Sequence, residues 1–127
     1  MFELDLRSHK SIYEQITDKF KELIMTGELE CGAKIPSVRD LSKTLGVNPN
    51  TIQKSYRELE RQGYIYTATG VGTFVADKRD IKPDHEAVEK AKETIRGGFK
   101  ELLYLGLSAE EAMKIAQEVI REKGEDK

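Results

Sequence analysis

The chain has 127 residues, 35% of them charged and 38% hydrophobic, a length that suits one compact domain with a small appendage. The N-terminus lacks the regions of a secretory signal, no run of about 18 apolar residues could span a membrane, and Cys31 has no partner for a disulfide within the chain. We therefore expect a soluble cytoplasmic protein without a structural zinc site, since one cysteine and two histidines cannot supply its four ligands, and no cofactor.

The first predicted helix begins at Ser11. Ser11 and Glu14 have the spacing of a capping box, in which each side chain accepts a hydrogen bond from the backbone N–H of the other residue. The helix is predicted to end near Gly27. Its apolar residues recur at helical spacing: Ile12, Ile16, Phe20, Leu23 and Ile24.

Two short helices joined by a tight turn are predicted next. The first follows Pro36, starts with a box formed by Ser37 and Asp40, and ends at Gly46. Its buried stripe consists of Val38, Leu41 and Leu45. The second starts at Asn48 and ends at Gly63, with the stripe Ile52, Tyr56 and Leu59. Such a pair, braced by a longer preceding helix, is typical of a helix-turn-helix.

The first turn of the third helix is polar. With its apolar stripe turned inward, the outward side chains are Asn50, Thr51, Gln53 and Lys54. A recognition helix approaches DNA with this turn, where free backbone N–H groups favour phosphate and short polar side chains reach base edges. Gln53 can bond adenine bidentately, whereas Lys54 suits phosphate. Capping and solvation are the alternative explanation; they account for Asn48 but leave the following segment unexplained.

A β-hairpin is predicted over residues 64–75. The β-rich segments YIYT and TFV flank Ala68–Gly72, where two glycines permit a tight bend. A hairpin alone usually has only a structural role, but directly after a helix-turn-helix it is expected to be a wing. Its tip would offer small groups and backbone N–H donors to a phosphate or a minor-groove edge: Thr69, Gly70, Gly72 and Thr73.

Charge is unevenly distributed along the chain. Residues 34–75 hold six basic and three acidic residues, a net charge of +3, within a chain whose formal net charge is −2. A local basic surface attracts a polyanion even when the whole chain is acidic. An ordinary solvated surface is the alternative interpretation of this charge pattern alone.

The remaining residues predict a linker and a helical hairpin. Residues 77–83 are charged and end in proline, which favours a linker, and residues 84–127 contain two apolar stripes at helical spacing. The first stripe consists of Val88, Ala91, Ile95, Phe99, Leu102 and Leu105. The second follows a Ser108–Glu111 box and consists of Ala112, Met113, Ala116, Val119 and Ile120. Two helices cannot bury both stripes by themselves, so we expect a second copy to cover them in a homodimer.

The segments KIPSVRDLSKTLGVNPNTIQKSYRELERQGYI and TGVGTFV resemble the GntR-type bacterial transcription regulators, over about residues 9–76. In that family the arginine of the P-S-x-R segment, the polar residues opening the recognition helix and the glycine at the wing tip touch DNA. Carried over, these are Arg39, Asn48, Asn50, Thr51, Gln53 and Gly70. Many members carry arginines where this chain has Pro49 and Gln53, and commonly an acidic residue where it has Val38, so base preference does not transfer.

The short tail resembles the YtrA-type branch of this family, whose members are dimers that lack a dedicated ligand domain. They commonly repress their own operons and neighbouring transporter genes. The resemblance leaves open whether a small effector binds at the dimer interface. We expect no enzymatic activity, because the sequence has no metal cluster, no phosphate-binding glycine loop ahead of a helix and no nucleophile–base pair.

Together these features predict an α+β, mostly α fold: a winged helix-turn-helix over residues 1–76, a linker over 77–83 and a helical dimerisation region over 84–127. The predicted function is that of a dimeric repressor that binds an inverted-repeat operator in double-stranded DNA. The alternative is a winged-helix protein-interaction module without DNA binding. The candidate DNA contacts are Ser37, Arg39, Asn48, Asn50, Thr51, Gln53, Lys54, Thr69, Gly70, Gly72 and Thr73.

Overall fold

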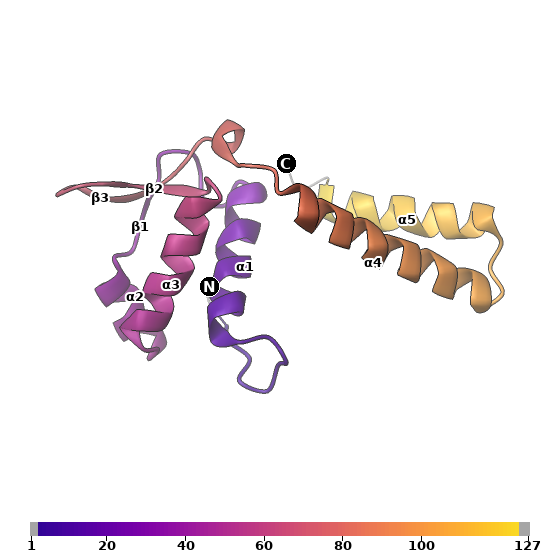
Figure 1. Ribbon diagram of the computed structural model, residues 1–127, viewed down its shortest axis with the longest axis horizontal. Coiled ribbons are helices and arrows are strands. Elements are labelled where there is room, and N and C mark those ends of the chain that lie inside the picture. The colour runs from indigo at the N-terminus through magenta and orange to yellow at the C-terminus, as the bar shows by residue number, and fades with distance from the viewer. Residues whose placement is uncertain (1–2, 125–127) are drawn as a thin grey trace. The chain divides into compact units, whose positions relative to one another are not determined.

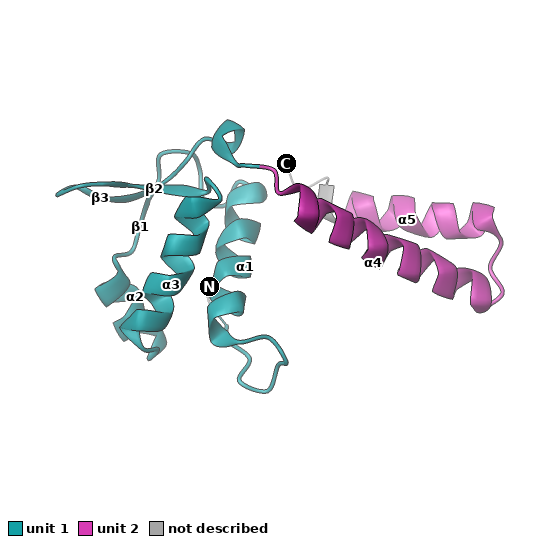
Figure 2. Ribbon diagram, in the orientation of Figure 1, with its two compact units in different colours: residues 1–82 teal, residues 83–127 magenta. Residues whose placement is uncertain are grey.

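Two units make up the chain in the computed structural model, which describes residues 3–124. Figure 2 shows the division between residues 1–82 and 83–127. The first unit contains α1 (Ile12–Met25), β1 (Lys34–Ile35), α2 (Val38–Leu45), α3 (Pro49–Arg61), β2 (Ile65–Ala68), β3 (Gly72–Val75) and the 3₁₀ turn η1 (Lys78–Asp80) (Figure 1). The second contains α4 (His85–Tyr104) and α5 (Ala109–Gly124). The predicted α+β, mostly α class is confirmed.

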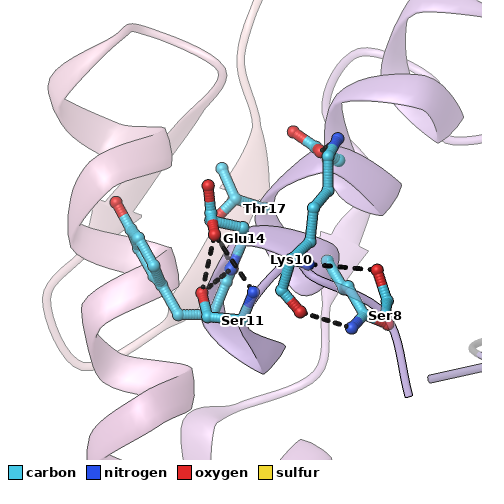
Figure 3. Close-up of polar contacts among 8 residues, drawn as sticks. Ser8, Lys10, Ser11, Glu14 and Thr17 are labelled. Atoms are coloured by element: carbon cyan, nitrogen blue, oxygen red, sulfur yellow. Dashed lines mark hydrogen bonds and ion pairs between the residues drawn. The ribbon is translucent and has the colours of Figure 1, made fainter. Parts of the chain in front are cut away.

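The helix starts follow the predicted caps. Ser11 and Glu14 make both bonds of their capping box at the start of α1 (Figure 3). At α2, the Ser37 hydroxyl accepts from the Asp40 N–H at 3.1 Å. Within the described residues Asp40 makes no return bond, because its side chain is one methylene shorter than glutamate. The predicted box at Ser37 is therefore a single cap.

A three-stranded antiparallel sheet closes the first unit, with the strand order β1-β3-β2. Strands β2 and β3 form the predicted hairpin, in the register Ile65↔Val75 and Ala68↔Gly72. Strand β1 was not predicted, because two residues are too few to show an alternating pattern. It pairs Lys34 with Phe74 and so ties the segment before α2 to the hairpin.

The core of the first unit holds α3 against α1. Phe20 and Tyr56 meet edge to face at 5.5 Å, and the Tyr56 hydroxyl donates to the Pro36 carbonyl at 2.6 Å. Burial raises the pKa of the Tyr56 hydroxyl, which stays protonated as this donor. The hydroxyls of Thr17 and Ser55 are buried and lie 2.8 Å apart, so they link the two helices. Other core residues are Ile16, Ile24, Ile35, Leu41, Ile52, Leu59, Ile65 and Val75.

Most of the segment predicted as a linker belongs to the first unit. Residues 78–80 form η1, and the Lys82 N–H donates to the Gln62 carbonyl at 2.9 Å. The backbone of Asp80 and Ile81 lies directly against Gly63. The unit therefore extends to residue 82 rather than 76, because hydrogen bonds hold a segment whose charged composition alone suggested a free linker.

The second unit is a hairpin of α4 and α5, which lie side by side (Figure 1). Gly106, with φ +97°, ends α4, and the predicted Ser108–Glu111 box opens α5 with both bonds. Ala112 is buried, and Leu102 is half-buried. The other residues of the two predicted stripes are exposed in the single chain, Ile95 by 70% and Ile120 by 69%. Within residues 3–124 no helix has the length and apolarity needed to cross a membrane.

Candidate nucleic-acid interface

The N-terminal turn of α3 presents the polar side chains that were predicted to face outward. Ile52 and Ser55 are fully buried, and these two positions fix the rotation of the helix about its axis. As a result Asn50, Gln53 and Lys54 are exposed, while Thr51 is half-buried. The turn therefore offers two side-chain carboxamides, one hydroxyl and one ammonium group on a single face.

Asn48 caps this turn. Its carboxamide oxygen accepts from the Asn50 N–H at 2.8 Å, and Pro49, which lacks an N–H, occupies the first helical position. Only the NH₂ group of Asn48 is therefore left to donate to a ligand. The Thr51 and Ile52 N–H groups already bond to the Asn48 carbonyl. The cap therefore orders the turn and takes up part of the hydrogen-bonding capacity that the sequence suggested for DNA.

Lys54 is held in place by Tyr13, a residue that the sequence analysis did not single out. The Lys54 ammonium lies 4.2 Å from the centre of the Tyr13 ring, which is a cation–π contact. The Tyr13 carbonyl accepts from the hydroxyls of Thr17 and Ser55, each at 2.8 Å. Tyr13 is thereby fixed to both α1 and α3. No local pattern could reveal this contact, because the two residues lie on different helices.

The start of α2 adds a second polar turn. Ser37 and Arg39 are exposed there, and the Ser37 hydroxyl serves as the cap described above. Free N–H groups at a helix N-terminus and an adjacent guanidinium both favour a phosphate oxygen. Arg39 and Lys54 thus present one cation from each of the two helices of the helix-turn-helix.

The wing has a tight turn at its tip. The Val71 N–H donates to the Ala68 carbonyl at 2.9 Å, and Gly70 has a φ of +79°, in the left-handed region that favours glycine. Thr69 and Gly70 are exposed, while Gly72 and Thr73 are half-buried. The predicted tip residues are thus brought together at one end of the hairpin, although half of them are shielded by neighbours.

Ion pairs reduce the number of basic groups available to a polyanion. Arg61 bonds the Glu58 carboxylate through its Nε at 3.0 Å. Hydrogen bonds from Arg61 and Gln62 lower the pKa of Glu58 to about 2, so this carboxylate is charged at neutral pH. The positive charge of Arg61 is therefore compensated locally. Within the described residues, no group of three or more His, Cys, Asp or Glu side chains could hold a metal ion.

Comparison with known proteins decides the family. The protein-family model described as "Bacterial regulatory proteins, gntR family" matches residues 12–75, from the start of α1 to the end of β3. The chain belongs to the GntR family. It is therefore a regulator with a DNA-binding helix-turn-helix, as the motifs predicted.

A full-length relative supports the YtrA-type subfamily within the GntR family. The chain is 35% identical over 119 residues to the HTH-type transcriptional repressor YtrA of Bacillus subtilis (strain 168), covering 94% of this chain and 92% of that protein. The curated GntR relatives are named as transcriptional regulators, a non-enzymatic role.

Two solved structures extend the comparison. A transcriptional antiterminator from Listeria monocytogenes EGD-e is 40% identical, with a TM-score of 0.76 and coverage of 94% of this chain and 89% of that one. The DNA-binding domain of AraR in complex with operator ORE1 is 33% identical, with a TM-score of 0.51 and coverage of 60% and 95%. The fold of the first unit is thus shared with a domain whose structure has been determined in complex with operator DNA.

Proposed function

We propose that this chain is a homodimeric transcriptional repressor that binds an inverted-repeat operator. The observation that carries the proposal is the exposed polar turn of α3, with Asn50, Gln53 and Lys54 on one face and the wing following in the same unit. Winged helix-turn-helix proteins place such a turn in the major groove. The repressor role is supported by the full-length similarity to a protein named as a repressor.

The proposed contacts divide into two classes. Gln53 is the base-reading residue, because its amide can bond the N6 and N7 groups of adenine at once. Lys54, Arg39 and the N-terminus of α2 contact phosphates, which position the protein without reading sequence. Ser37, Asn48, Asn50 and Thr51 supply further polar groups beside them, and the wing residues Thr69, Gly70, Gly72 and Thr73 contact the DNA from the hairpin.

The helical hairpin is the proposed dimer interface. Ile95, Phe99, Met113 and Ile120 are among its exposed large apolar residues, with Ile95 exposed by 70%. Covering this surface with the same surface of a second chain gives a closed, two-fold interface. Two recognition helices related by a two-fold axis match two half-sites in inverted orientation.

Sequence choice is tested by selection of duplexes from a random pool. Wild-type protein is expected to select an inverted repeat. Gln53→Ala should relax preference at one position in each half-site, where a good bidentate contact contributes about 1–3 kcal/mol of discrimination. Lys54→Ala should weaken binding to all sequences alike. If no motif emerged from the selection, or if Gln53→Ala selected the wild-type motif unchanged, the proposed reading role would be wrong.

Dimerisation is tested by placing a carboxylate in the apolar surface. Ile95→Glu should yield monomers in sedimentation, because an unpaired charge would have to be buried on association. Lys90→Glu is the matched control: Lys90 is exposed and helical periodicity places it away from the Ile95 stripe. A dimer that survives Ile95→Glu, or that Lys90→Glu disrupts equally, would contradict the proposed interface.

A further inference from the structure

Lys34 lies across the wing, a position that the sequence did not indicate. It sits on β1 directly opposite Phe74 of β3, and its side chain is exposed. A Cβ built on Gly72 would lie 2.6 Å from the Cε of Lys34 and 3.4 Å from its Nζ. The lysine side chain therefore runs from β1 over β3 and ends beside Gly72, two residues from the wing-tip Gly70.

Gly72 leaves the space that this side chain occupies. At 2.6 Å, a Cβ and the Lys34 Cε could not coexist, so any larger residue at position 72 would push the lysine away. Gly72 also has a φ of +148°, which L-residues rarely adopt. Two properties of one glycine thus act together: its backbone begins the returning strand, and its missing side chain opens a path for Lys34.

The neighbours of Lys34 restrict where its ammonium can go. Tyr66 and Phe74 are cross-strand partners on the same sheet face and stack at 5.7 Å between ring centres. Lys34 is opposite Phe74, so the aromatic pair forms an apolar flank on that face. Across residues 3–124, Lys34 takes part in no ion pair. Beside the wing there is therefore an exposed lysine whose ammonium pairs with no carboxylate of the described residues.

We propose that Lys34 is a DNA-backbone contact of the wing, and that Gly72 positions it. Its ligand is a phosphate oxygen of double-stranded DNA, because an ammonium is a compact charge with three donors and lacks the planar fork that reads base edges. This inference rests on the proposed DNA-binding function and extends the contact surface from the wing tip to β1. Gly72 then acts through Lys34 as well as through its own backbone.

The salt dependence of binding to the selected duplex tests Lys34. Lys34→Gln removes the charge and keeps a polar side chain, so the log–log salt slope should become shallower by about 0.9, the value for one phosphate. If both proteins bind equally at 1 M salt, this change in slope makes Lys34→Gln bind DNA about eight-fold more weakly than the wild type at 0.1 M. Lys34→Arg should restore the wild-type slope. Lys19→Gln is the control, because Lys19 lies on α1 and pairs with Glu22 at 3.8 Å.

A double-mutant cycle tests the part played by Gly72. Gly72→Ala should weaken DNA binding in the wild type and less so in Lys34→Gln, since the displaced ammonium is already absent. Additive effects of the two changes would show that Gly72 does not act through Lys34. Circular dichroism verifies that each variant is folded; if Gly72→Ala does not fold, the comparison of Lys34→Gln with Lys34→Arg decides the proposal.

The outcomes separate this inference from the function on which it rests. If wild-type protein binds with a steep salt slope, Lys54→Ala makes that slope shallower and Lys34→Gln leaves it unchanged, then the Lys34 contact is refuted while DNA binding stands. If the wild-type protein shows no salt-dependent binding to any selected duplex, both fail. A slope changed equally by Lys34→Gln and Lys19→Gln would reflect total charge alone and would also overturn the contact.

Discussion

Replacing Gly63 by alanine should destabilise the first unit more than the same change at Gly27. Both glycines follow the C-terminus of a helix, with nearly equal φ values of +86° for Gly27 and +89° for Gly63. A Cβ at Gly27 would meet no atom within 4 Å. A Cβ at Gly63 would lie 2.0 Å from the Asp80 carbonyl oxygen. The pair therefore separates backbone strain from a steric clash.

The expected magnitudes follow from these contacts. Alanine at a left-handed position costs about 1–2 kcal/mol, and reduced freedom of the unfolded chain offsets about 0.4–1 kcal/mol of this, so Gly27→Ala should lose about 1 kcal/mol. In Gly63→Ala the backbone at 80–81 must also move. That movement breaks the hydrogen bond from Lys82 to Gln62, which contributes about 0.5–1.5 kcal/mol. Gly63→Ala should thus lose about 1.5–2.5 kcal/mol.

Urea unfolding followed by far-ultraviolet circular dichroism measures both variants. Protein concentration must be the same throughout, because association contributes to apparent stability. Equal destabilisation of the two variants, within about 0.5 kcal/mol, would refute the reasoning. It would mean that residues 80–82 are not held against Gly63 and that the first unit ends near residue 76, where the sequence placed its end.

Three further changes test other parts of the structure. Glu58→Gln should lower the free energy of unfolding at neutral pH, because a carboxylate with a lowered pKa stabilises the fold only while it is ionised. The difference from the wild type should shrink as the pH falls from about 4.5 to about 2. Unfolding measured as a function of pH checks this, and a difference that stays constant down to pH 2 would contradict it. Gly97→Ala should raise the free energy of unfolding in urea by about 0.5–1 kcal/mol, because Gly97 is exposed within α4 and a Cβ there meets nothing within 4 Å. A lower free energy of unfolding in this variant would contradict the prediction. Tyr13→Leu should weaken DNA binding about two- to five-fold, as expected for loss of an exposed cation–π contact. Tyr13→Phe should weaken it less, because it retains the ring over which Lys54 lies. Equal losses of DNA binding in both variants would argue against that contact.

The elements that the sequence predicted are those with strong local signals. Capping serines at 11 and 108, the glycines that end helices and the stripes at helical spacing each depend on neighbouring residues, so they are visible without a structure. The rotation of α3 followed from its apolar stripe, because Ile52, Tyr56 and Leu59 must face the core. This rotation also gave the outward position of Gln53 and Lys54.

The features that were missed depend on contacts between distant residues. Strand β1 exists because Lys34 and Ile35 find partners on β3, and the pair has no pattern of its own. The end of the first unit was placed too early because the bond from Lys82 to Gln62 is a tertiary contact. The contacts of Lys54 with Tyr13 and of Lys34 with Gly72 join different elements for the same reason. A single sequence shows such residues as ordinary charges and glycines.

The most direct test of the proposed function compares the full chain with a chain ending at Lys82, on duplexes carrying one or two selected half-sites. Without the α4–α5 hairpin, the first unit should be monomeric in sedimentation, retain the same half-site preference and bind the two-site duplex about 10² to 10⁴-fold more weakly than the full chain, because a linked second encounter is intramolecular. On a single half-site the two chains should differ far less. A monomeric shortened chain that binds the inverted repeat as tightly as the full chain would contradict the dimeric mechanism.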